Sequence, residues 1–189
     1  MFSLQQLVVD FSLIDRHHHL AKTNRHENDS EHSLAVIMLC WYIYDKDKPD
    51  LDIAKIFKYA TAHDLVEVYA GDTNTFASKK ERQDKLVAER KSLIRLSAEI
   101  GVFSDLVTSM HNYESKVEKE ALFVWTVDKM QALIMGDMDD WRPYKELNIS
   151  YAQFCTRYEE LLSQSSPFCK ELFAELIEYC KTTYYDRPV

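Results

Sequence analysis

The chain has 189 residues, of which 46% are hydrophobic and 29% are charged, an ordinary composition for a folded globular protein. Its formal net charge of −8 at pH 7 argues against general binding to nucleic acid or to an anionic membrane surface. No apolar run approaches the roughly 20 residues of a membrane span, and the N-terminus lacks the features of a signal peptide. The four cysteines form no C-x-x-C pair, which favours reduced thiols over disulfides and a cytoplasmic location.

Apolar residues recur at helical spacing through almost the whole chain, and only three glycines and four prolines interrupt it. All-β proteins need more of these turn residues. We therefore expect an all-α bundle of about seven to nine helices, in a single domain over residues 1–189. The core of this domain that carries the sequence motifs lies at about 16–135, and we expect the helices at 150–184 to pack on that core or on a partner. In chain order the expected helices span residues 2–14, 30–44, 52–71, 78–101, 103–113, 117–135, 150–163 and 167–184. Ser30 or Asp29 can cap the second of them, and Asp50 or Asp52 the third.

The expected second helix carries a histidine at the start of its apolar face. Ala35, Val36, Leu39 and Ile43 form a helical stripe, and one turn back along it lies His32. A lone histidine at a helix start is more often a capping or core residue than a metal ligand. His32 therefore points to a metal only if other helices place similar groups beside it.

The expected third helix continues its apolar face into titratable residues. Ile56 and Tyr59 lead on to His63 and then to Glu67, while Asp64 lies next to His63, about 100° further round the helix. A His-Asp pair arises often by chance, and Glu67 alone reads equally well as an exposed helix carboxylate. The placement of His63 and Asp64 on a face that should be buried favours a shared partner.

A carboxylate interrupts the apolar face of the expected sixth helix. Ala121 and Val124 precede Asp128 on that face. Burying a carboxylate without a partner is costly. Asp128 therefore needs either a buried arginine, such as Arg90 or Arg95, or a metal ion.

Three helices thus each offer metal-ligating groups on a face that should be buried. One divalent ion would satisfy all of them at once, because imidazole nitrogens and carboxylate oxygens are common metal ligands. A mixed set without thiolate suits Mn²⁺, Co²⁺, Fe²⁺, Ni²⁺, Zn²⁺ or Mg²⁺, and spacing alone does not choose among them. The sequence predicts a site for one divalent metal ion made by His32, His63, Asp64 and Asp128.

The order H…HD…D on an all-helical chain resembles the HD-domain metal-dependent phosphohydrolases. Three segments resemble those of the bacterial HD-domain 5′-nucleotidases, which act on deoxynucleoside monophosphates. They are RHENDSEHSL at 25–34, AHDLVEVYAGD at 62–72 and TVDKMQAL at 126–133. The resemblance spans about residues 16–133 and does not extend to the C-terminal helices.

The resemblance implies roles for individual residues. It makes His32, His63, Asp64 and Asp128 the metal ligands, Glu67 the catalytic acid, Asp72 the acid that contacts the sugar, and Arg16 or Arg25 phosphate-binding arginines. By themselves, Asp72 reads as an ordinary turn residue and Arg25 as a partner of Glu27 or Glu31. Lys79 can draw a phosphate toward the site. It forms a cluster with Lys80 and Arg82, and most of that cluster is better explained as the solvated start of a helix.

Two departures from the family pattern fall where the sugar and base would lie. Arg16 is followed by His17, where the family often has an aromatic residue, and no proline follows Gly71 and Asp72. The three consecutive histidines at 17–19 cannot chelate one ion from a helix, because neighbouring side chains point about 100° apart. We expect them at the protein surface or at the rim of the pocket.

These features together predict a metal-dependent phosphohydrolase that removes the 5′-phosphate of (deoxy)nucleoside monophosphates by attack of a metal-bound water. The expected partner is a small-molecule nucleotide, and the resemblance suggests a homodimer. One alternative is an HD phosphohydrolase that acts on another phosphoester. The other alternative is a non-catalytic helical module that keeps the metal as a structural staple, with no open coordination position.

Overall fold

The computed structural model describes residues 2–185, and the expected all-α bundle is confirmed. The long helices are α1 (Phe2–Ser12), α2 (Asp29–Asp47), α3 (Ile53–Ala62), α5 (Lys79–Glu99), α6 (Ser104–Ser115), α7 (Lys119–Met138), α9 (Tyr151–Ser163) and α10 (Lys170–Tyr185). Two short helices, α4 (Glu67–Ala70) and α8 (Arg142–Glu146), and a hairpin of β1 (Asp15–His19) and β2 (His26–Asn28) complete the described elements. Among these residues, no helix is long and apolar enough to cross a membrane.

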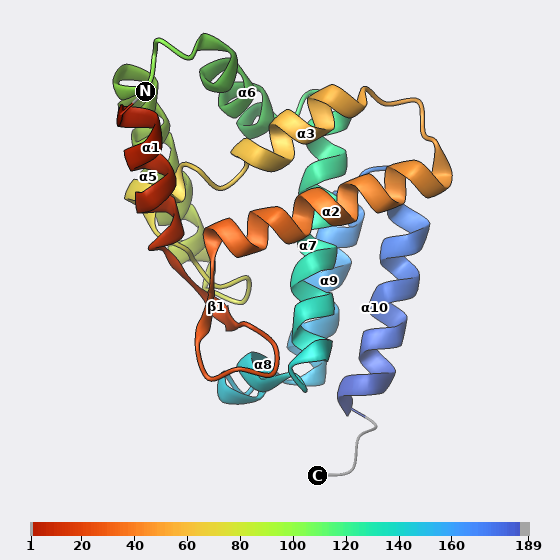
Figure 1. Cartoon of the computed structure of the whole chain (residues 1–189). Helices are drawn as coiled ribbons and strands as arrows, with labels where there is room; N and C mark the ends of the chain where they lie inside the picture. The colour runs from red at the N-terminus through yellow and green to blue at the C-terminus, as the bar shows by residue number, and fades with distance from the viewer. Residues whose placement is uncertain (1, 186–189) are drawn as a thin grey trace.

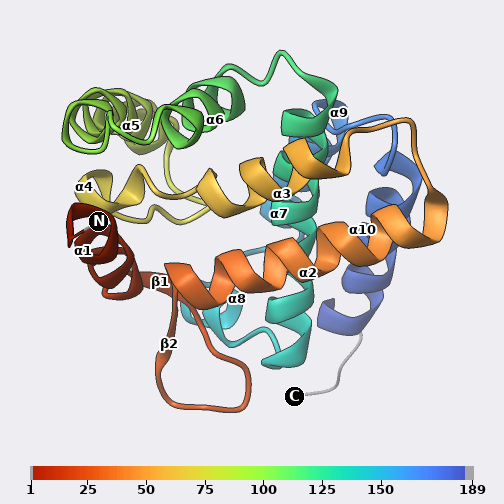
Figure 2. The ribbon, with the colours of Figure 1, turned by 45° about the horizontal axis from the view of Figure 1, so that its top comes forward.

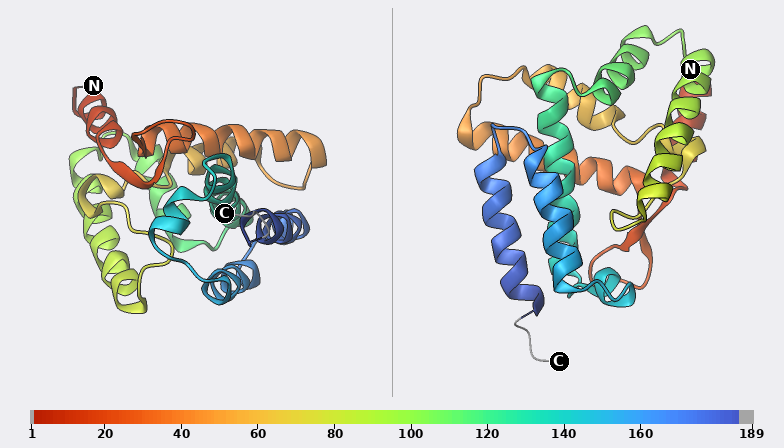
Figure 3. Two further views of the ribbon diagram at one scale, coloured as in Figure 1. Left: turned by 90° about the horizontal axis from the view of Figure 1, so that it is seen from below. Right: turned by 180° about the vertical axis from the view of Figure 1, so that it is seen from behind.

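Helix α7 runs through the middle of the molecule and contacts α2, α3, α6 and α10 (Figure 1). Helices α2 and α3 cross it on one side, and α9 and α10 stand beside it as seen from behind (Figure 3). Helices α1, α4, α5 and α6 form a second group next to them (Figure 2). The C-terminal helix therefore packs within this chain, where Phe173, Ile177 and Cys180 are buried.

The buried apolar residues form two clusters that meet at the His-Asp pair. The larger cluster surrounds α7 and includes Tyr59 and Ala60 of α3, whereas the smaller one includes Leu65 and Val66. The residues between them along the chain, 63 and 64, therefore lie at the boundary of the two clusters. All four cysteines lie within the described residues, and none of them is in a disulfide, as expected.

The prediction of one continuous helix over residues 52–71 is wrong. Helix α3 ends at Ala62, residues 63–66 form turns, and α4 begins at Glu67. The turn is tight, because the N–H of Leu65 bonds to the carbonyl of Ala62, and that of Glu67 to the carbonyl of Asp64. This break lies between residues of the two apolar clusters.

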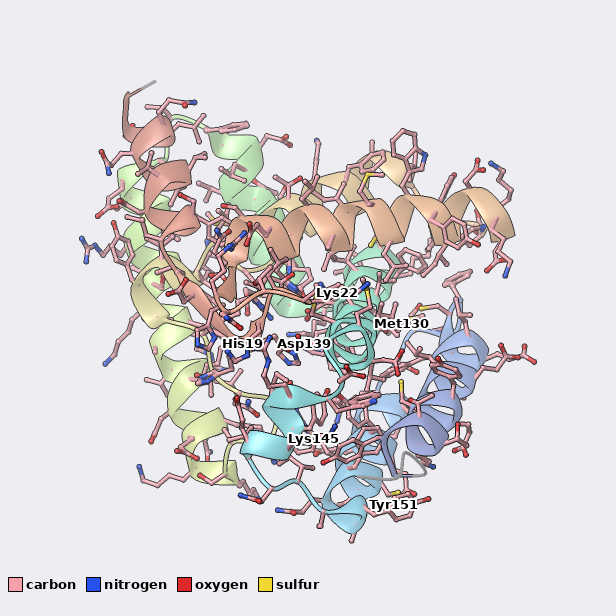
Figure 4. The ribbon with its side chains drawn as sticks, turned by 60° about the horizontal axis from the view of Figure 1, so that its bottom comes forward. His19, Lys22, Met130, Asp139, Lys145 and Tyr151 are labelled. Atoms are coloured by element: carbon pink, nitrogen blue, oxygen red, sulfur yellow. The ribbon has the colours of Figure 1, made fainter. Side chains whose placement is uncertain are left out.

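The first expected helix ends early, because a hairpin that the helical periodicity did not predict follows it. Strands β1 and β2 are antiparallel, and His19 is paired with His26. Strand alternation turns Arg16 inward and leaves His17 exposed, as expected for the surface or the rim, whereas His18 and His19 are half-buried with buried Nδ1 atoms. The hairpin loop is tied to the end of α7 by a 3.3 Å hydrogen bond from the Lys22 backbone N–H to Asp139 Oδ1 (Figure 4).

The cap of α2 is Asn28, and the expected caps Ser30 and Asp29 lie inside the helix. The Asn28 side chain accepts from the backbone N–H of Glu31, whose carboxylate accepts in turn from the N–H of Asn28. This reciprocal capping box fixes the start of the helix. Asp29 consequently becomes the first helical residue and is fully buried. At α3 the expected cap Asp52 is confirmed.

Candidate active site

Two histidines, from α2 and from the turn after α3, direct one ring nitrogen each to a common point. His32 Nδ1 lies 2.9 Å from Gln131 Oε1, and His63 Nδ1 lies 2.9 Å from the carbonyl oxygen of Ala60. Both contacts need Nδ1 to donate, so in the neutral ring each Nε2 atom carries the lone pair. His63 Nε2 is buried and has no hydrogen-bond partner among residues 2–185. The two rings are thus held in the tautomer that binds metal through Nε2.

Two carboxylate groups lie beside the same two Nε2 atoms. Asp128 Oδ1 lies 3.0 Å from His32 Nε2, and Asp64 Oδ2 lies 3.2 Å from His63 Nε2 and 3.5 Å from His32 Nε2. Atoms that bind one ion at about 2.1 Å lie roughly 3.0–3.4 Å apart, so these spacings suit neighbouring ligands of a single ion. The ligand atoms of His32, His63 and Asp128 all lie within 4.8 Å of one another. The donor set therefore fits a divalent metal ion.

Neighbouring side chains hold the ligands in place. Gln131, one turn after Asp128 on α7, accepts from His32 and donates to Glu27 Oε1 at 3.3 Å. Lys129 Nζ donates to Asp128 Oδ2 at 2.6 Å. Asp128 pairs with neither Arg90 nor Arg95: within the described chain its ion-pair partner is Lys129, and its other contact is His32 Nε2. The alternative of a buried arginine partner for Asp128 is therefore wrong.

The protonation of these groups follows from burial and from neighbouring charge. Burial would raise the pKa of Asp64, but the adjacent His63 ring, when it is protonated, and the Arg16 guanidinium outweigh burial and hold that pKa well below its usual range. Burial likewise opposes ionisation of Asp128, and Lys129 and His32 together lower its pKa. Burial, followed by the charge of Arg16, lowers the pKa of His32. Anionic carboxylates and a neutral His32 are the forms that coordinate metal.

Glu67 lies at the start of α4, with its carboxylate beside the metal-type centre. Its Oε1 accepts a 2.6 Å hydrogen bond from Lys85 of α5, and its buried Oε2 has no hydrogen-bond partner within the part of the chain described. Burial, followed by the charge of Asp64, raises the pKa of Glu67 well above its usual value, while Lys85 opposes the shift. An unpartnered oxygen with raised proton affinity suits a group that accepts a proton.

Arg16 and Asp72 stand next to the same centre. The Arg16 guanidinium donates to Asp64 Oδ2 at 2.8 Å and to Asp29 Oδ1 at 3.1 Å. Asp72 follows Gly71, whose φ of 73° ends α4 in a conformation that favours glycine, and its Oδ2 accepts from the N–H of His17 at 3.0 Å. Burial would raise the pKa of Asp72, but Arg16 and Lys85 outweigh it and the pKa falls.

The structure does not bring the other two expected phosphate-binding residues to this centre. Arg25 is exposed and forms two hydrogen bonds to Glu31, at 2.7 and 2.5 Å, which agrees with the alternative of an ion pair with Glu31. Lys79 is exposed at the first position of α5. Neither residue is among the described residues that line the cavity over the centre.

A cavity of about 330 Å³ opens over the ligands, within the range of roughly 300–1,000 Å³ that is typical of small-molecule sites. A second hollow of about 710 Å³ adjoins it at Asp72 and Lys85, and His17 lines that second hollow. The first cavity is lined by His63, Asp64 and Asp128 of the metal-type centre, by Glu67 and Asp72, and by six cations, Arg16, Arg82, Lys85, Lys116, Lys129 and Arg157. Glu89 and Glu114 also line it, so the centre faces an open space with many charges of both signs.

Several residues of the site escaped the sequence analysis. Gln131 and Asp29 each lie three residues from a ligand on the same helix, a spacing that could have identified them. Glu27 precedes the helix and Lys85 comes from α5, so no local pattern connects them to the centre. Only the packing of β2 against α2, of β1 against α7 and of α5 against α4 reveals their proximity.

The fold is all-α, and a buried centre of histidine and aspartate side chains faces a cavity. Comparison with known families identifies the family to which the chain belongs. The chain belongs to the HD domain family, whose model matches residues 13–168. No curated protein sequence matches it.

Two solved structures are similar to this one. The crystal structure of a predicted metal-dependent phosphohydrolase from Magnetospirillum magnetotacticum MS-1 has a TM-score of 0.77 and 21% identity, and the match covers 99% of this chain and 98% of that one. A conserved hypothetical protein from Pyrococcus furiosus has a TM-score of 0.65 and 22% identity, with coverages of 94% and 99%. At these identities the likeness supports the fold.

Proposed function

We propose that this protein is a metal-dependent phosphohydrolase that removes the 5′-phosphate of nucleoside or deoxynucleoside monophosphates. The observation that carries the proposal is the position of Glu67, whose buried and unpartnered oxygen stands beside a four-ligand centre that faces a cavity. The similar structure from Magnetospirillum magnetotacticum, described as a predicted metal-dependent phosphohydrolase, supports the reaction class. The nucleotide is inferred from the resemblance of the sequence segments.

His32, His63, Asp64 and Asp128 would hold one divalent ion in this proposal. The ion would neutralise phosphate charge and lower the pKa of a coordinated water by several units. His63, Asp64 and Asp128 line the cavity, so part of the coordination sphere is open to solvent or substrate. A structural metal is normally enclosed by four protein ligands without such an opening, which favours a catalytic role over a staple.

Glu67 is the group that we assign as general base. The Lys85 ammonium holds one carboxylate oxygen, so the other is fixed in direction and free to accept the proton of the attacking water. The raised pKa of Glu67 increases its affinity for that proton, and the proton can then pass to the leaving alkoxide. Lys85 opposes part of the burial effect and so favours the ionised form of Glu67.

We assign Arg16 to the phosphate of the substrate and Asp72 to its sugar. Arg16 has the planar fork of donors that suits a phosphate, and it is fixed beside Asp64. Asp72 lies where the first cavity meets the larger hollow, so it is placed to accept a hydrogen bond from a sugar hydroxyl. Arg25 and Lys79 lie outside the cavity, so we give Arg16 the phosphate-binding role.

The test is a substrate and metal panel on the purified protein. The protein is stripped of metal and supplied with Mn²⁺, Co²⁺, Ni²⁺, Zn²⁺, Mg²⁺ or, without oxygen, Fe²⁺, and released phosphate is measured. The substrates are ribo- and deoxyribonucleoside 5′-monophosphates, their 3′-isomers, a cyclic nucleotide and a sugar phosphate. We expect turnover of the 5′-monophosphates with at least one metal. Turnover of a different phosphoester alone would support the alternative phosphohydrolase.

Two variants show whether turnover comes from this centre. Asp128→Asn should abolish metal-dependent activity, because it weakens a direct ligand, and Glu67→Gln should lower kcat about 10²–10⁴-fold while metal affinity stays the same. Circular dichroism checks that both variants fold. Folded wild-type protein that binds metal and hydrolyses none of these substrates would leave the structural staple as the better explanation.

A further inference from the structure

A second group of potential cation ligands lies beside the metal-type centre, and the centre shares one carboxylate with it. Oxygen atoms of Asp29, Asp64 and Glu67 lie within 4.8 Å of one another. Asp29 and Glu67 are each at most 2% exposed, and Asp29 Oδ2 and Glu67 Oε2 have no hydrogen-bond partner in residues 2–185. Two buried, unpartnered carboxylate oxygens are costly unless a cation stands close to them.

The cation at this position is the Arg16 side chain. Its Nη1 lies 2.8 Å from Asp64 Oδ2, 3.1 Å from Asp29 Oδ1 and 4.0 Å from Glu67 Oε2. Its Nε lies 3.9 Å from Glu27 Oε2. The guanidinium is therefore surrounded by the same three carboxylates that form the second ligand group, and a fourth stands behind it.

We propose that Arg16 is a built-in second cation, anchored by Asp29, and that its guanidinium restricts this centre to a single metal ion. The inference rests on the proposed function only for its consequence in catalysis, since the number of ions bound is independent of any substrate. The Asp64 carboxylate belongs to both groups, so removal of the guanidinium would leave two adjacent cation sites that share one carboxylate.

A second cation at this position would serve phosphoryl transfer. Two-metal phosphatases use ions about 3.5–4 Å apart to stabilise the attacking and the leaving oxygens. A guanidinium in the second position supplies a permanent charge, because it stays protonated in proteins, and several N–H donors for phosphate oxygens. It cannot be lost to a chelator, so the protein would need to acquire only one ion.

Asp29 is the residue that distinguishes this proposal from simple phosphate binding by an arginine. It is fully buried at the first turn of α2, so a carboxylate there has no access to solvent. Its contact to Arg16 Nη1 and the contact of Glu27 to Arg16 Nε hold the guanidinium from two sides. Asp29 is therefore a positioning residue, which acts through Arg16.

Metal stoichiometry tests the inference directly. Metal-free protein is titrated with Mn²⁺, bound Mn²⁺ is measured by electron paramagnetic resonance, and the count is checked by elemental analysis after gel filtration. Wild type should bind one ion per chain. Arg16→Met should bind two, because Asp29, Asp64 and Glu67 then lack their internal cation. Arg16→Lys, which retains a positive charge, should return the count to one.

A double variant locates the second ion. Arg16→Met combined with Asp29→Asn removes one of the three carboxylates and should again bind a single ion. The matched control is Arg95→Met, which removes an exposed arginine that pairs with Glu99 on α5 and should leave the count at one. Circular dichroism and thermal unfolding report whether each variant is folded.

The measured ion counts either support or overturn the inference. One ion in wild type and two in Arg16→Met support the inference, even if no phosphatase activity is found. Two ions in wild type, one ion in folded Arg16→Met, or no bound ion in either protein would overturn it. If Arg16→Met does not fold, Arg16→Gln is used in its place with the same expected count. A failed substrate panel with the expected ion counts would overturn the proposed function alone.

Discussion

Gln131 of α7 holds the His32 ring through a 2.9 Å contact between Oε1 and Nδ1, and it donates in turn to Glu27. This contact fixes both the tautomer and the orientation of a residue that we assign as a metal ligand. Loss of a group that orients a metal ligand typically lowers metal affinity or activity by about 10–100-fold. Gln131 is therefore as much part of the centre as the HD pair.

Replacing Gln131 should weaken metal binding without removing a ligand. Gln131→Leu leaves Nδ1 of the buried His32 without an acceptor, and we expect metal affinity to fall by about 10–100-fold. Mn²⁺ titration of the metal-free protein measures the change. The control is Gln83→Leu at an exposed position of α5. Equal affinities in Gln131→Leu and wild type would show that His32 does not depend on this contact.

The contact between Lys85 and Glu67 should appear in the pH dependence of the reaction. Lys85 lowers the pKa of Glu67 against the larger effects of burial and Asp64, so Lys85→Met should raise that pKa further. A base must be deprotonated to act, so the acidic limb of the pH profile should move to higher pH in the variant. The measurement is kcat/KM against pH. An unshifted limb would mean that a group other than Glu67 controls it.

His18 should make the stability of the protein depend on pH. Burial, followed by the charge of Arg16, lowers the pKa of His18 from 6.5 to about 4. Between these values the unfolded chain binds a proton that the folded chain does not, so this contribution to stability decreases as pH falls from 6.5 to 4. The loss amounts to at most about 3 kcal/mol.

His18→Phe isolates this effect, because Phe can keep the edge-on ring contact to Tyr144 but carries no titrating group. We expect the free energy of unfolding of the variant, relative to wild type, to increase as pH falls from 7.5 to 4.5. Urea unfolding at several pH values measures it. Parallel pH curves for the two proteins would contradict the prediction. Taking the difference from wild type cancels the contributions of the buried carboxylates, which the two proteins share.

Gly136 allows α7 to pack closely against two aromatic rings. A Cβ at this position would lie 2.9 Å from Tyr144 Cε2 and 3.1 Å from Trp141 Cζ3, and both rings are buried. Overpacking of this kind typically costs 1–3 kcal/mol, whereas alanine in a helix regains up to about 1 kcal/mol. We expect Gly136→Ala to destabilise the fold by about 1–2 kcal/mol.

Thermal or urea unfolding checks this value, with Met138→Ala at the exposed end of the same helix as the control. A variant as stable as wild type would show that the Trp141 and Tyr144 rings can move apart at little cost.

The helical periodicity of the sequence was sufficient to predict the all-α class, because apolar residues at a spacing of 3.6 must face a common core. It also placed His32, His63, Asp64 and Asp128 on buried faces, and the structure brings their side chains together. Local pattern is enough here, since His32, His63 and Asp128 each continue the apolar stripe of an expected helix and Asp64 adjoins His63. The roles of these residues as ligands stay a prediction until metal binding is measured.

Only the tertiary structure decided what surrounds those residues. It broke the third helix at His63, converted the segment of Arg16 into a strand, and brought Lys85 to Glu67 and Asp29 to Arg16. These contacts join elements that are remote in the chain, and their strength depends on distance and burial, which a sequence pattern does not encode. The sequence by itself determined which residues face inward, whereas packing determined which charges meet there.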